Sequence, residues 1–118
     1  MSRRANRRRG EVEAVIGGER RILCLTLGAL AELETAFAAD NLADLARRFS
    51  AGKLSANDLI RIIGAGLRGG GNLVSDDDVA VMTLDEGLAG AARLVTRLLS
   101  ATFAASEPAG APEPPANP

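Results

Sequence analysis

Two adjacent glycines, Gly17 and Gly18, separate two short strand-like segments and restrict the fold more than any other feature. Glycine reaches positive φ without a steric penalty, so the pair suits the two-residue loop of a type I′ β-hairpin. In the register set by this loop, Ile16 lies opposite Glu19, and one face of the hairpin is apolar. That face holds Val12, Ala14, Ile16, Leu23 and Leu25. The sequence therefore predicts an N-terminal two-stranded hairpin.

A two-stranded hairpin alone is marginally stable in water, so helices or another chain must cover its apolar face. Helices follow directly, because apolar residues recur every three or four positions after Leu27, with capping residues and glycines between segments. They are predicted at about residues 27–37, 42–51, 56–69, 76–82 and 84–104, the last opened by a capping box at Thr83–Glu86. The predicted fold class is mainly α with an N-terminal two-stranded β-hairpin (α+β), in which a small helical bundle packs on the hairpin.

The domain organisation follows from length and composition. A chain of 118 residues fits one domain, because two independent cores need more residues. Only three residues are aromatic, so the core must be built mainly from Leu, Ile, Val and Ala. Residues 1–10 are basic without periodicity, and residues 106–118 are rich in proline with little to bury. We expect a disordered basic arm (1–10), a hairpin and helical domain (11–105) and a disordered Pro/Ala-rich tail (106–118).

The residue types exclude several kinds of catalytic and metal site. Histidine is absent and Cys24 is the single cysteine, so histidine-based triads, His-ligated zinc and an internal disulfide are excluded. No dinucleotide fingerprint follows a strand. Cys24 itself has no histidine to take its proton and is interpreted as a core or edge residue. We expect no enzymatic activity, no catalytic residue, no cofactor and no bound metal.

The chain also lacks the signals of membrane insertion and export. No apolar run approaches the ~20 residues that span a bilayer. The arginine-rich start is not followed by the apolar segment of a signal peptide. We expect a cytoplasmic protein without a membrane partner.

Two loop motifs have a functional and a structural interpretation. The glycines at 69–71 beside Arg68 are compatible with a phosphate-binding loop, but no Lys-Ser/Thr follows them and no strand precedes them, which favours a helix terminator. The acidic run at 76–78 is compatible with a cation site, but it lacks the alternating spacing of a calcium loop. Stabilisation of a helix N-terminus is the favoured interpretation of this run.

The arginine arm is the strongest candidate for nucleic-acid binding. Five of the fourteen lysine and arginine residues precede Gly10, whereas all fifteen acidic residues follow it. Five positive charges could neutralise several phosphates and give salt-dependent binding. No aromatic residue lies between the arginines to stack on bases, and the acidic remainder of the chain repels a phosphate backbone. A solvated arm or a protein contact is therefore favoured over a nucleic-acid partner.

Three stretches resemble a known family. They are residues 5–12 (ANRRRGEV), 25–34 (LTLGALAELE) and 59–68 (LIRIIGAGLR), and the similarity covers nearly all of residues 5–105. The family is that of gene transfer agent and phage tail assembly chaperones, which are also known under tail-tube names. The chain departs from the family at Gly17-Gly18, where Asp-Gly is expected, and in its Pro-rich tail. The resemblance implies a protein that binds the long helical tape measure protein, keeps it soluble and leaves as tube subunits polymerise.

The leading functional hypothesis is therefore a tail assembly chaperone, cytoplasmic in a bacterial host cell. Its partners would be the tape measure protein and, as a second candidate, the tail tube protein, with self-association left open. A structural tube or terminator component is the first alternative, although tube subunits usually have several long strands and two are predicted. A nucleic-acid-binding accessory is the second. The predicted partner-binding residues are Val12, Ile16, Leu23, Leu25, Leu88, Val95, Leu99 and Phe103.

Overall fold

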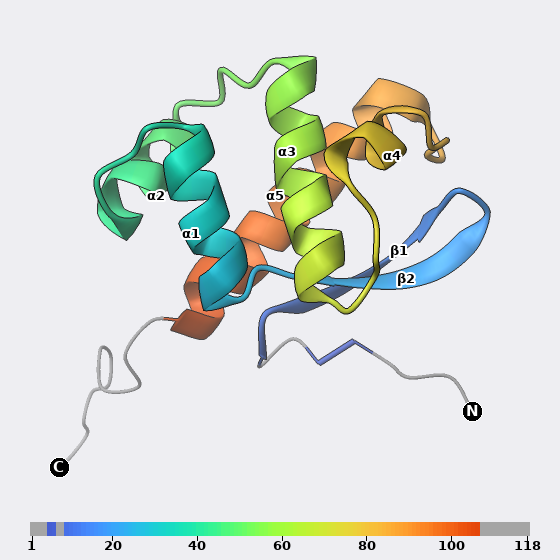
Figure 1. Ribbon diagram of the computed structural model, residues 1–118, viewed down its shortest axis with the longest axis horizontal. Coiled ribbons are helices and arrows are strands. Elements are labelled where there is room, and N and C mark those ends of the chain that lie inside the picture. Colours follow the sequence, from blue (N-terminus) through green and yellow to red (C-terminus); the bar gives the residue numbers. More distant parts are fainter. Residues whose placement is uncertain (1–4, 7–8, 107–118) are drawn as a thin grey trace, which may run out of the picture.

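The computed structural model describes residues 5–6 and 9–106 and has the predicted order of elements (Figure 1). The fold class predicted from the sequence, mainly α with an N-terminal hairpin, is confirmed. Most of the predicted arm and all of the predicted tail after Ser106 lie outside the described residues. The elements are β1 (Glu11–Ile16), β2 (Glu19–Cys24), α1 (Leu27–Ala36), α2 (Leu42–Ser50), α3 (Ala56–Gly69), α4 (Asp76–Ala80) and α5 (Gly87–Ser106).

The hairpin has the predicted turn and register. Gly17 and Gly18 have φ of 64° and 81°, as a type I′ loop requires at both positions. Ile16 pairs with Glu19, and the pairing continues without a bulge to Glu11 and Cys24. On the predicted apolar face four side chains are buried and Ala14 is half-buried against the core. The four are Val12, Ile16, Leu23 and Leu25.

Helix α3 is the centre of the fold and crosses the hairpin (Figure 1). Ile62, Ile63 and Leu67 are fully enclosed between the strands and the neighbouring helices. Its three glycines permit close approach; a Cβ built on Gly66, for example, would lie 2.7 Å from a methyl carbon of Leu98 on α5. The helical glycines therefore have a packing role that outweighs their low helix propensity.

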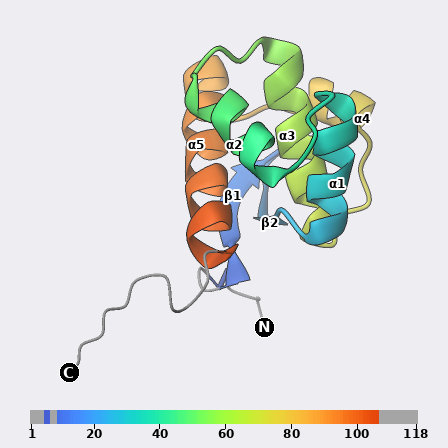
Figure 2. The same cartoon turned by 90° about the vertical axis from the view of Figure 1, so that its left-hand side faces the viewer.

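Both edges of the two-stranded sheet are covered by the described part of the chain itself. At the outer edge of β2, a Cβ on Gly70 would collide with the carbonyl oxygen of Ile22, and Asn72 Nδ2 donates to the same oxygen at 3.0 Å. At the edge of β1, which faces α5 in Figure 2, Arg97 donates to the carbonyl oxygen of Glu13 at 2.9 Å. Strand addition to either edge would have to displace these contacts.

The predicted start of the last helix is wrong by three residues. A capping box at Thr83–Glu86 was expected, but α5 begins at Gly87. Leu84 instead forms an isolated antiparallel bridge with Ile16, and Gly17 N donates to Thr83 O at 2.8 Å. Glu86 and Gly87 have positive φ of 66° and 56°, so the chain turns before it becomes helical. Tertiary pairing with β1 has overridden the local capping signal.

The other predicted caps are present. Ser55 accepts from Asp58 N at 3.1 Å while the Asp58 carboxylate accepts from Ser55 N, which completes the capping box of α3. Thr26 and Asn41 cap α1 and α2 in the same way, each accepting from the backbone amide three residues later. At these three helices a short polar side chain before an apolar helical repeat marks the start correctly.

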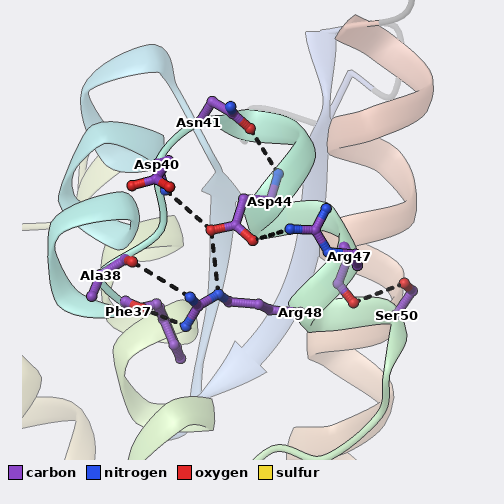
Figure 3. A network of polar contacts seen from close by, with 8 residues as sticks. All are labelled: Phe37, Ala38, Asp40, Asn41, Asp44, Arg47, Arg48 and Ser50. Atoms are coloured by element: carbon purple, nitrogen blue, oxygen red, sulfur yellow. Dashed lines mark hydrogen bonds and ion pairs between the residues drawn. The ribbon is translucent and has the colours of Figure 1, made fainter.

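A polar network joins α1 to α2 (Figure 3). Arg48 donates to the carbonyl oxygen of Phe37 at 2.8 Å and so satisfies an acceptor at the end of α1. Asp44 accepts from Asp40 N at 3.1 Å and pairs with Arg47 and Arg48. The hydrogen bond from Asp40 N–H is the main reason why the pKa of Asp44 is below its ordinary value, and both arginines lower it further.

Part of the predicted basic arm contacts the hairpin. Asn6 O accepts from Arg9 N and Glu11 N, at 2.9 and 3.1 Å, and Asn6 N donates to the Glu11 carboxylate at 2.8 Å. Ala5 N donates to the carboxylate of Glu13 at 3.2 Å. The arginines at 3, 4, 7 and 8, on which the nucleic-acid interpretation depends, lie outside the described residues.

Candidate functional site

The eight side chains predicted to bind a partner are divided by the structure into two groups. Five are buried in the core of a single copy and present no surface: Val12, Ile16, Leu23, Leu25 and Val95. Leu99 and Phe103 are half-buried against the core, and Leu88 is 70% exposed. A role in partner binding stays a prediction for the set, and the accessible apolar surface lies around Leu88.

An apolar cleft opens beside Leu88, between α3, α4 and the start of α5. Its volume is about 340 Å³. Every lining residue except Thr83 is apolar or glycine, and none is charged. The lining comprises Ala56, Leu59, Ile60, Ile63, Val79, Ala80, Met82, Thr83, Leu84, Gly87, Leu88 and Ala91. This composition is typical of a surface that binds another apolar surface.

The cleft exists because α4 is too short to close the gap between α3 and α5. Helix α4 has only five residues and buries one side chain, Val79. The chain then leaves the helix and runs to β1, where Leu84 is held by its bridge to Ile16. Ile60 on α3, which borders the cleft, is thereby left half-buried, with a partly open side toward the start of α5.

Exposed apolar residues lie at the cleft and beside it in the chain. Leu88 belongs to its lining, and Val81, next to the lining residues Ala80 and Met82, is 83% exposed. Two charged residues are chain neighbours of lining residues: Arg61 follows Ile60 on α3, and Asp85, which follows Leu84, lines a separate pocket with Arg93 and Arg97. The side chains of Arg61 and Asp85 are exposed, and among the described residues neither has an ion pair.

The arginine beside the glycine run has a structural role. Arg68 donates to Glu32 at 2.6 Å, to Asp76 at 3.0 Å and to the carbonyl oxygen of Val74 at 3.1 Å, which ties α1, α3 and α4 together. The hydrogen bond to Glu32 is the main reason why the pKa of Arg68 is raised. The absence of a side chain at Gly64 leaves room for the Asp76 carboxylate.

These contacts favour the structural interpretation of both loop motifs. The glycines at 69–70 pack on the backbone of β2, and Arg68 already binds two carboxylates, so the region lacks the free donors of a phosphate loop. Asp76 pairs with Arg68, and Asp78 completes a capping box with Ser75. Within residues 5–6 and 9–106 no three His, Cys, Asp or Glu side chains form a group that could hold a metal.

Sequence reasoning missed most of the cleft. The predicted helices at 56–69, 76–82 and 84–104 contain Ile60, Met82 and Leu84, but no joint surface was predicted for them. The available signal was the brevity of the apolar segment at 79–84, which carries four large apolar residues in six positions and is too short to bury them all. Which of them face α3 depends on the bridge to β1, and no local pattern reveals that bridge.

Comparison with known proteins gives one match. The sequence model of a family described as "Phage tail tube protein, GTA-gp10" matches residues 9–105. No curated protein and no solved structure matches the chain. Among the helices of the described residues, none is long and apolar enough to cross a membrane.

Proposed function

Because the chain belongs to the phage tail tube protein, GTA-gp10, family, we propose that it is a structural component of a phage-like tail that associates with other tail proteins. The observation that carries this proposal is the extent of the match. Residues 9–105 include both strands and every helix of the described chain except the last residue of α5. The structural alternative is therefore preferred to the chaperone that the sequence alone suggested.

The distribution of apolar surface supports association through helices. The two sheet edges are occupied by Arg97 and by Asn72, so contacts with other subunits by strand pairing would require rearrangement. The cleft beside Leu88 is instead open and without charge in its lining. Side-chain packing in this cleft is the contact that the surface favours.

Counting copies in finished particles tests the proposal. Purified tails should contain this chain in a fixed ratio to the major tail proteins, measured by mass spectrometry with isotope-labelled peptides from α3 and α5. The ratio should survive high-salt washing and a gradient, which remove loosely bound proteins. A chain that is abundant in the lysate and missing from the particles would contradict a structural role.

A tail assembly chaperone that binds the tape measure protein is the second candidate. The observation that favours it is the sheet, which has only two strands in the described residues and both of its edges covered. An apolar cleft between helices is also the kind of groove that takes the apolar face of a single helix. Co-expression distinguishes the candidates, because a chaperone should raise the soluble fraction of the tape measure protein.

Matched variants make the co-expression test specific. Leu88→Asp places a charge at the cleft, whereas Leu73→Asp places the same charge on a side chain that is 99% exposed outside it. A chaperone that uses the cleft should lose its effect with the first variant and keep it with the second. Equal solubility of the tape measure protein with and without the wild-type chain would contradict the chaperone.

A further inference from the structure

We propose that residues 73–82 form a strap over helix α3 that opens independently of the rest of the fold, and that the ion pair between Arg68 and Asp76 is the latch that holds it closed. This inference does not depend on the proposed tail function. The strap contains α4 and the turns on each side of it. It is anchored firmly at both ends, whereas only a few groups hold it between them.

The chain on each side of the strap is anchored to the hairpin. Just before the strap, Asn72 Nδ2 donates to the carbonyl oxygen of Ile22 on β2 at 3.0 Å. Just after it, Thr83 O accepts from Gly17 N at 2.8 Å, and the bridge of Leu84 to β1 follows. Because both anchors lie on the sheet, the segment between them can leave α3 while the sheet stays intact.

Between the anchors the strap buries little apolar surface. Within it Val79 alone is buried, whereas Leu73 and Val81 are 99% and 83% exposed. Burial of apolar side chains is the main favourable term that holds a segment in place, so a segment with one buried side chain has a low free energy of local opening. The turns at 73–75 and 81–82 lie outside helices and strands and can absorb the change of backbone angles.

Arg68 on α3 joins the strap to the rest of the molecule. Its Nη1 donates to the Asp76 carboxylate at 3.0 Å and to the carbonyl oxygen of Val74 at 3.1 Å, and its Nη2 donates to Glu32 on α1 at 2.6 Å. The planar guanidinium thus holds two groups of the strap and one of α1 in fixed directions. A Cβ on Gly64 would collide with the Asp76 carboxylate, so the glycine is what allows the latch to close.

Release of the latch should also melt α4. A helix of five residues is too short to persist without tertiary packing, and its capping box between Ser75 and Asp78 lies wholly within the strap. Opening therefore withdraws Val79 from α3 and widens the cleft that it shares with Ile60 and Ile63. The latch would thereby control how much apolar surface of α3 is accessible.

Amide hydrogen exchange of the full-length chain, followed residue by residue by NMR, tests the proposal. The amides of Val79, Val81 and Met82 donate to carbonyl oxygens within the strap, so their exchange reports its opening. Arg68→Met should speed this exchange about fivefold and leave the protected amides of β2 unchanged. Arg20→Met is the matched control, because it breaks an ion pair in the hairpin and should not change exchange in the strap.

A second pair of variants tests the latch from the side of the strap. Asp76→Asn removes the carboxylate that Arg68 binds, whereas Asp77→Asn removes an exposed carboxylate from the same first turn of α4. Exchange in the strap should be faster with Asp76→Asn than with Asp77→Asn. Combining Asp76→Asn with Arg68→Met should add little, because both remove the same ion pair.

Two results would overturn the proposal. The first is exchange of the strap amides only at the rate of the most protected core amides, which would mean that the strap opens only with global unfolding. The second is a double variant whose two effects on exchange multiply in full, which would mean that Arg68 and Asp76 act separately. Circular dichroism confirms that each variant is folded.

Discussion

The two halves of α3 carry the same kind of side chain but are covered to different extents. The half toward the C-terminus, with Leu67 and the glycines at 66 and 69, is sealed against β2 and α5. The half toward the N-terminus, with Ile60, borders an open cleft. The difference lies in the backbone, because glycines allow close approach at one end and a five-residue α4 leaves a gap at the other. Burial in this chain is therefore decided by how closely the elements approach and not by hydrophobicity.

The largest contrast between the halves should come from two leucines on α5. Leu98 on α5 is fully buried against the sealed half of α3. Leu98→Ala should therefore lower the free energy of unfolding by about 3 kcal/mol. Leu88 lies at the cleft and is 70% exposed, and Leu88→Ala should change the free energy of unfolding by less than about 0.5 kcal/mol. Urea unfolding followed by circular dichroism measures the difference. Equal losses would show that the cleft residues are as constrained as the core.

The glycine that seals the hairpin edge should be nearly as sensitive. In Gly70→Ala the new Cβ collides with the carbonyl oxygen of Ile22, and we expect a loss of about 2 kcal/mol of unfolding free energy. Gly28→Ala is the matched control, because a Cβ there meets only Thr26 Oγ1 at 3.8 Å. The control should be stabilising by up to about 1 kcal/mol, since alanine is the better helix former. Similar thermal midpoints for the two variants would contradict this account of the sealed half.

The start of α3, at the cleft end, should depend on its cap. Ser55→Ala removes the side-chain acceptor for Asp58 N and should cost about 1 kcal/mol. Amide exchange at residues 57–59 should become faster, while exchange in the sealed half should stay slow until global unfolding. Ser100→Ala, on the exposed face of α5, is the control and should leave both rates unchanged. Uniformly faster exchange would mean that the two ends of α3 do not open separately.

The smallest effect should come from pH. The pKa of Asp44 is lowered in the folded protein, mainly by the hydrogen bond from Asp40 N–H, so its ionised form favours folding. This contribution is fully present above about pH 4, which is the pKa of an aspartate in the unfolded chain. It is lost as the pH falls through the lower pKa of Asp44 in the folded protein. The urea midpoints of the wild type and Asp44→Asn should therefore differ slightly at pH 7 and converge toward pH 2. A difference between the two urea midpoints that grows as the pH falls would contradict the lowered pKa of Asp44.

Local sequence patterns predicted the fold where the determining contacts are close in sequence. The hairpin register follows from Gly17-Gly18, and three helix starts follow from caps within three residues of the groups they bind. The start of α5 could not be predicted in this way, because Leu84 is held by Ile16, far away in the sequence. Five of the predicted partner-binding residues, Val95 among them, proved to be core residues for the same reason. Apolar periodicity identifies a face to be covered without telling which part of the chain covers it.

The covered sheet edges have a consequence for behaviour at high concentration. Tail assembly gathers many copies of a protein in one place, and an unprotected strand edge would then template cross-β stacking between copies. In this chain the Arg97 guanidinium and the Asn72 amide occupy carbonyl groups on the two opposite edges. Loss of the Arg97 or the Asn72 contact should first be visible as thioflavin-positive aggregates in concentrated samples, before any change in the helical circular dichroism signal.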